Sequence, residues 1–158
     1  MLREILRYKQ RLDNLFSKIS AFSGRPAEFE LRSHWTRYLC VLVSGFLEVS
    51  IYEIYTAYAK DKSAPNIANY IEAQLEGFQN PKMGKILQVV EAFNPKWAEE
   101  IQNLPDYLKI KNAVDSVVAN RHKIAHGEDV DIEYNRLRSW YADVYKLIVI
   151  LYDQCGLT

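Results

Sequence analysis

The feature that most constrains the fold is a long helical segment from about residue 27 to residue 60 that lacks a polar face in its middle. Over residues 38–54, apolar residues occupy nearly every side of the predicted helix. A helix that is apolar all round is normally covered by other elements on every side. The same run contains Glu48 and Glu53, which make it too polar for a convincing membrane span. The sequence therefore predicts the central helix of a bundle.

Other segments also repeat apolar residues at steps of three and four, which is the helical period. Ser23-Gly24-Arg25-Pro26 is predicted to end the first helix. Asn94 and Asp131 are plausible N-caps, and Gly127 fits the position just past a helix end. We predict an all-α fold, a four-helix up-and-down bundle in one domain over residues 1–158, with short helices inserted over about residues 65–104. The core helices cover about residues 2–22, 27–60, 106–126 and 132–155.

Charge and cysteine content limit the classes of function. Lys and Arg total 20, as do Asp and Glu, so the net charge is zero. Any anion must then be bound at a local site and not by a generally basic surface. Cys40 and Cys155 lie in apolar helical patterns, where buried free thiols are expected. The N-terminal stretch is charged from its third residue and does not resemble a signal peptide, so a reduced cytoplasmic setting is expected.

One arginine stands in an apolar row. Ile110, Val114, Val117, Arg121 and Ile124 follow one another at steps of 4, 3, 4 and 3, and so share one helix face. Burying a guanidinium without a partner costs several kcal/mol. Two interpretations stay open: Arg121 extends to the edge of the core, or it has a specific partner such as a carboxylate or a phosphate.

His126 follows Arg121 at the end of the same helix. The helix dipole favours a cationic histidine there, which is a purely structural role. Together, however, the two residues are the minimum set for metal-free RNA cleavage. A histidine can take the proton of a 2′-hydroxyl, and an arginine can bind the phosphate and stabilise charge on it.

A metal site is the competing interpretation of this segment. His122 and His126 are four residues apart, the spacing of helical zinc ligands. A third ligand would have to come from Asp115 or His34. No Glu follows His122, and the sequence has no further histidine cluster. We therefore expect no metal and no other cofactor.

The same residues resemble the HEPN superfamily (higher eukaryotes and prokaryotes nucleotide-binding). Arg121, four residues and His126 match its R-x4–6-H motif, and His122 is one of the residue types that the family places after the arginine. The ending "IAHG" and the stretch "SGFLEVSIYE" resemble the RiboL-PSP and MAE-type branches. The resemblance implies a metal-independent endoribonuclease in which two motifs meet across a homodimer, with a toxin–antitoxin or phage-defence role. The products would carry 2′,3′-cyclic phosphate and 5′-hydroxyl ends.

The resemblance also assigns roles to residues. Arg121 would stabilise the scissile phosphate and His126 would be the catalytic histidine. His122 would help orient the substrate, and Asn120 would add a hydrogen bond. Family members often carry an acidic residue near the motif on the second helix, so Glu48 is expected near Arg121. The alternative for Glu48 is a salt bridge to Arg37 or Lys60.

The expected partners are RNA, a second copy of the chain and an antitoxin of the nucleotidyltransferase type, with no membrane. Lys123, Arg136 and Arg138 form either a local basic patch or a solvated face. The alternative function is a non-catalytic interaction or nucleotide-binding module with the same fold. Tyrosines are frequent and fit either an interface between chains or the edge of the core: Tyr52, Tyr55, Tyr58, Tyr134, Tyr141, Tyr145 and Tyr152.

Overall fold

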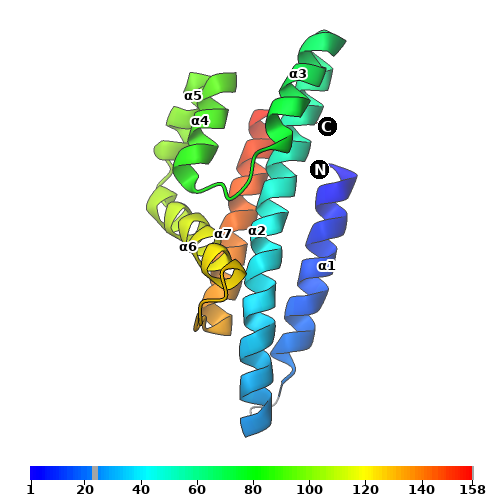
Figure 1. The fold of residues 1–158 in the computed structure, drawn as a ribbon. Helices are drawn as coiled ribbons and strands as arrows, with labels where there is room; N and C mark the ends of the chain where they lie inside the picture. Colours follow the sequence, from blue (N-terminus) through cyan, green and yellow to red (C-terminus); the bar gives the residue numbers. More distant parts are fainter. Residues whose placement is uncertain (23–24, 158) are drawn as a thin grey trace.

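The computed structural model describes residues 1–22 and 25–157, and every regular element in this part of the chain is an α-helix (Figure 1). The predicted all-α class is therefore confirmed. The turn predicted at Ser23-Gly24 lies outside the described residues. The helices are α1 (Arg3–Ser20), α2 (Pro26–Lys62), α3 (Pro65–Glu76), α4 (Met83–Phe93), α5 (Pro95–Gln102), α6 (Tyr107–Ala125) and α7 (Tyr134–Gln154).

The helix α2 lies at the centre of the packing. It contacts α1, α3, α6 and α7, and Figure 1 shows it running the length of the molecule. Leu39, Val43, Phe46 and Leu47 are fully buried, as predicted for a helix covered on several sides. The segment Glu28–Lys62 is long and apolar enough to span a membrane, but 61% of its most apolar window is buried inside the fold. That burial is expected of a central bundle helix.

The helices α3, α4 and α5 are short and lie within residues 65–104, where the sequence predicts an insertion of short helices. The helix α3 packs on α2, α4 packs on α5, and α4 also contacts α6. Buried residues of the insertion belong to the same hydrophobic cluster as those of the four long helices. Asn94 caps α5 as predicted, because its Oδ1 accepts a hydrogen bond from the Lys96 backbone N–H at 3.1 Å. The up-and-down order of the bundle and its single-domain organisation stay predictions.

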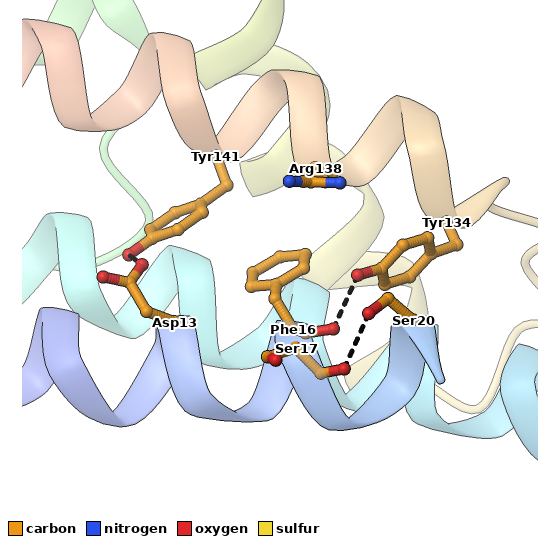
Figure 2. A pocket seen from close by; sticks show the side chains of 7 residues that line it. All are labelled: Asp13, Phe16, Ser17, Ser20, Tyr134, Arg138 and Tyr141. Carbon is orange, nitrogen blue, oxygen red and sulfur yellow. Dashed lines mark hydrogen bonds between the residues drawn. The ribbon is translucent and has the colours of Figure 1, made fainter. Parts of the chain in front are cut away.

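Tyrosine side chains join α7 to α1 (Figure 2). The Tyr134 hydroxyl donates to the Phe16 carbonyl at 2.6 Å, and the Tyr141 hydroxyl donates to Asp13 Oδ1 at 2.8 Å. The rings of Phe16 and Tyr141 stack with centroids 4.9 Å apart. Tyr55 and Tyr152 are also buried. These tyrosines therefore lie at the core or its edge within one chain.

The last helix begins later than predicted. Asp131 is not its N-cap, since α7 starts at Tyr134 with Glu133 at the cap position. The physical reason is the burial of the two residues that flank Asp131, while Asp131 itself is exposed. Val130 and Ile132 are 7% and 6% exposed, so both anchor a non-helical segment on the core before α7 begins.

Candidate functional site

Arg121 lies at the rim of the core row on α6. Ile110, Val114 and Val117, which precede it on this face, are fully buried, whereas Arg121 and Ile124 are only partly buried. Within the described chain, the Arg121 guanidinium has no hydrogen bond and no carboxylate at ion-pair distance. A cation held at a core edge without a protein partner is free to bind an anion.

The end of α6 fixes the backbone around His126. His126 is the C-cap residue, and Gly127 follows with a φ of 76°, as predicted for this glycine. The Gly127 N–H donates to the Ile124 carbonyl at 3.1 Å, and the Glu128 N–H donates to the Lys123 carbonyl at 3.0 Å. This pair of bonds is the Schellman motif, which ends a helix at a defined residue. His126 therefore projects from a sharply terminated helix.

The two histidines of the motif contact each other. The rings of His122 and His126 meet edge to face, with centroids 4.3 Å apart and an interplanar angle of 60°. Both side chains are exposed. The structure thus brings together the motif's histidines on one exposed surface at the C-terminal end of α6, where the helix dipole favours a positive charge.

Two of the three supporting residues, Asn120 and Glu48, have other partners. The Asn120 amide Nδ2 donates to the Ser116 carbonyl of its own helix at 2.8 Å. Glu48 Oε1 accepts the backbone N–H of Asn80 at 2.7 Å. Glu48 makes no ion pair with Arg121 within the described residues.

The alternative partners of Glu48 are also engaged elsewhere. Arg37 Nη1 lies 3.0 Å from Asp129 Oδ1, and Lys60 Nζ lies 2.9 Å from Glu72 Oε1. The Glu48 carboxylate therefore binds a backbone N–H of the loop between α3 and α4. No sequence pattern predicted this contact.

A cavity of about 410 Å³ opens beside the motif, between α6 and the loop that joins α3 to α4. We call it the α6 cavity. Sequence reasoning missed Asn80, Lys82 and Glu128 as site residues, because Asn80-Pro81 indicated only a break between helices. The lining residues are Asn80, Lys82, Val118, Ala119, His122, Lys123 and Glu128.

The residues considered as a third metal ligand have other partners. Asp115 Oδ1 accepts the Met83 N–H at 2.8 Å and its Oδ2 pairs with Lys111 at 2.7 Å. His34 Nδ1 is 3.2 Å from Arg37 Nη2. In the described part of the chain, no group of three His, Cys, Asp or Glu residues is arranged to hold a metal ion.

The proposed basic patch is divided between two cavities. Lys123 lines the α6 cavity, whereas Arg138 lines a separate cavity of about 310 Å³ between α1 and α7, which Figure 2 shows. Arg136 is exposed. Cys40 and Cys155 are buried free thiols, as predicted, and burial raises the pKa of each to about 12.

One of three comparisons with known proteins gives a match. The sequence model of a family described as RiboL-PSP-HEPN matches residues 3–156, which is almost the whole chain. No significant match was found among curated proteins or among solved structures.

Proposed function

Because the chain belongs to the RiboL-PSP-HEPN family, we propose that it is a metal-independent endoribonuclease whose site is completed in a homodimer. A nuclease or RNA-related role is consistent with that family. The observation that carries the proposal is the Arg121 guanidinium, which has no partner within the described chain and belongs to the same helix end as His126. An unpaired cation at the same helix end as a group able to move a proton suits a phosphodiester substrate.

The reaction needs only groups that the motif supplies. His126 takes the proton of the ribose 2′-hydroxyl, and the 2′ oxygen attacks the adjacent phosphorus. Arg121 stabilises the negative charge that develops on the phosphoryl oxygens. The bond from phosphorus to the 5′ oxygen then breaks. That oxygen takes a proton from a protonated histidine, which the second copy of the motif supplies. The products are a 2′,3′-cyclic phosphate and a 5′-hydroxyl.

The N-terminal half of α2 supports the proposed homodimer. Leu31, Trp35 and Tyr38 are spaced as one helix face, and Leu31 and Tyr38 are 46% and 42% exposed. The ion pair between Arg37 and Asp129 joins this part of α2 to the loop that follows His126. An exposed apolar face beside the motif is suited to a second copy that brings its own motif. We call Leu31, Trp35 and Tyr38 the α2 face.

The biological setting is part of the same proposal. We propose a cytoplasmic toxin or phage-defence enzyme that acts on RNA and is controlled by an antitoxin of the nucleotidyltransferase type. Support comes from the family, whose domains often bind RNA and dimerise. The non-catalytic module is the second candidate, and it is favoured by the zero net charge, which gives RNA no long-range attraction.

Cleavage of RNA in excess EDTA tests the proposal. Wild-type protein should cut single-stranded RNA and leave cyclic-phosphate ends, and Arg121→Ala and His126→Ala should each lower the rate by at least about 100-fold. Arg3→Ala is the matched control, because Arg3 is exposed on α1. It should cut at the wild-type rate.

Each other outcome decides against part of the proposal. Cleavage that persists in both motif variants would mean another site or a contaminant. Wild-type protein that binds RNA but leaves it intact would identify a binding module. Cleavage that occurs without EDTA and is lost when EDTA is added would support a metal site at His122 and His126.

A further inference from the structure

The α6 cavity combines two cations and one anion next to the motif. Lys82, Lys123 and Glu128 all line it, and within the described chain none of the three makes an ion pair with another. His122, in the same wall, contacts the His126 ring at 4.3 Å between centroids. The volume of about 410 Å³ lies within the usual range for ligand sites, roughly 300–1,000 Å³.

The wall that carries Lys82 is anchored on both sides. The Asn80 N–H donates to Glu48 Oε1 of α2 at 2.7 Å, and the Met83 N–H donates to Asp115 Oδ1 of α6 at 2.8 Å. Asn80 has a φ of 50°, a left-handed conformation that asparagine tolerates better than most residues. Pro81 between them is buried. Lys82 is therefore presented from a loop held against two core helices, although its own side chain is exposed.

We propose that the α6 cavity binds the nucleotide next to the scissile bond, and that it selects guanine. The phosphate of that nucleotide lies between Lys82 and Lys123. The Watson–Crick edge of its base meets the Glu128 carboxylate. This inference rests on the proposed function, since it places the nucleotide beside Arg121 and His126.

The chemistry of the wall determines the substrate class. Two lysines favour a phosphate, whereas the Glu128 carboxylate that lines the same cavity needs hydrogen-bond donors, which a phosphate alone does not offer. A ligand with both an anion and neighbouring N–H donors satisfies all three groups. Guanine offers N1–H and the N2 amino group side by side, and a carboxylate has two oxygens that accept such a pair. Protein–RNA sites commonly read the edges of unpaired bases in this way.

Binding to an uncleavable RNA tests the phosphate contacts. The probe is a fluorescein-labelled uridine octamer with 2′-O-methyl groups, which removes the attacking hydroxyl. Its affinity is measured by anisotropy at several salt concentrations. Lys82→Gln and Lys123→Gln should each reduce the slope of log K against log salt by about 0.7, the value for one lost phosphate contact on a single strand. Lys96→Gln, an exposed lysine on α5, should keep the wild-type slope.

Octamers in which guanosine, adenosine or cytidine replaces two of the uridines test the base contact. Wild-type protein should bind the guanosine probe about tenfold more tightly than the others, as for one bidentate contact. Glu128→Gln should remove this preference. Glu99→Gln, which makes the same change on α5, should retain it.

The outcomes separate this inference from the proposed function. An unchanged slope in both lysine variants, or a guanine preference that survives Glu128→Gln, overturns the nucleotide site even if Arg121-dependent cleavage is found. Lysine-dependent binding without any cleavage overturns the nuclease and keeps the cavity as an RNA-binding site. Wild-type protein that binds none of the octamers overturns both.

Discussion

Arg121 differs from the other residues of its row in what it contributes to stability. A guanidinium at the core rim without a protein partner gains no ion pair and loses part of its hydration. Arg121→Met keeps the apolar length of the side chain. We expect it to change the free energy of unfolding by no more than about 0.5 kcal/mol, the range of ordinary surface changes. Urea unfolding followed by circular dichroism measures this difference.

Val117→Ala is the comparison one turn earlier on the same face. Val117 is fully buried, so its truncation should cost about 1–3 kcal/mol. A loss of that size in Arg121→Met as well would mean that the arginine serves the fold. The presence of Arg121 on the core face of α6 would then be explained by stability, without a bound anion.

Some site residues were accessible to sequence reasoning and others were not. Helical periodicity places Arg121 on a core face and His126 at a helix end from local spacing alone. Lys82 lines the α6 cavity together with His122 and Lys123, although it lies some 40 residues earlier in the chain, and only tertiary packing brings the two segments together. Glu48 was expected near Arg121 from the resemblance, but its carboxylate instead holds Asn80. Which partner a half-buried carboxylate meets depends on packing that no local pattern encodes.

The end of α6 is an element whose geometry depends on one glycine. Gly127 has a φ of 76°, and a Cβ added there would meet nothing within 4 Å. Gly127→Ala should therefore cost about 1–2 kcal/mol from backbone strain alone, since L-residues disfavour this conformation. Gly127→Asn should cost less, because asparagine tolerates it. Thermal and urea unfolding of both variants measure the order.

Gly77 provides the control for this prediction. It is the C-cap of α3 with a φ of −85°, and it also has open space around its Cα. Gly77→Ala should be neutral or stabilise the fold by up to about 1 kcal/mol, because it restricts only the unfolded chain. Equal losses at both glycines would show that φ is not what sets the cost at Gly127.

Helix ends marked by a glycine or by an asparagine cap with proline were predicted well, and one other end was not. Gly127 and Asn94 each have a local mechanism, and both act as expected. Asp131 had the right residue type for a cap but lies between two buried residues. Burial of Val130 and Ile132 delays α7 to Tyr134, so tertiary anchoring overrides the local preference.

At the scale of the whole molecule, composition and periodicity predicted the class of fold but not what the tyrosines do. A central helix that is apolar on all sides requires covering helices, and α1, α3, α6 and α7 provide them. Tyr134 and Tyr141 are used inside the chain, where they bridge α1 and α7. The α2 face is exposed and apolar, and it adjoins Arg37 in the sequence. Arg37 forms an ion pair with Asp129, in the loop that follows His126.

If two motifs complete one site, activity must depend on dimer concentration. Specific activity should fall on dilution below the dimer dissociation constant, because the monomer lacks half of the site. Tyr38→Glu should give a folded, inactive monomer, since it buries an unpaired charge in the α2 face. Tyr70→Glu is the matched control, because Tyr70 is 64% exposed on α3. Sedimentation velocity, circular dichroism and the EDTA cleavage assay on the same samples measure mass, fold and rate.

The combination of mass and rate separates the position of the interface from the sharing of the site. A Tyr38→Glu monomer that cuts at the wild-type rate would show that one chain carries a complete site. A Tyr38→Glu dimer with full activity would move the interface to another surface and leave the composite site standing. Specific activity that is constant over a dilution range in which the mass halves would exclude a shared site, because a site built from two chains cannot survive their separation.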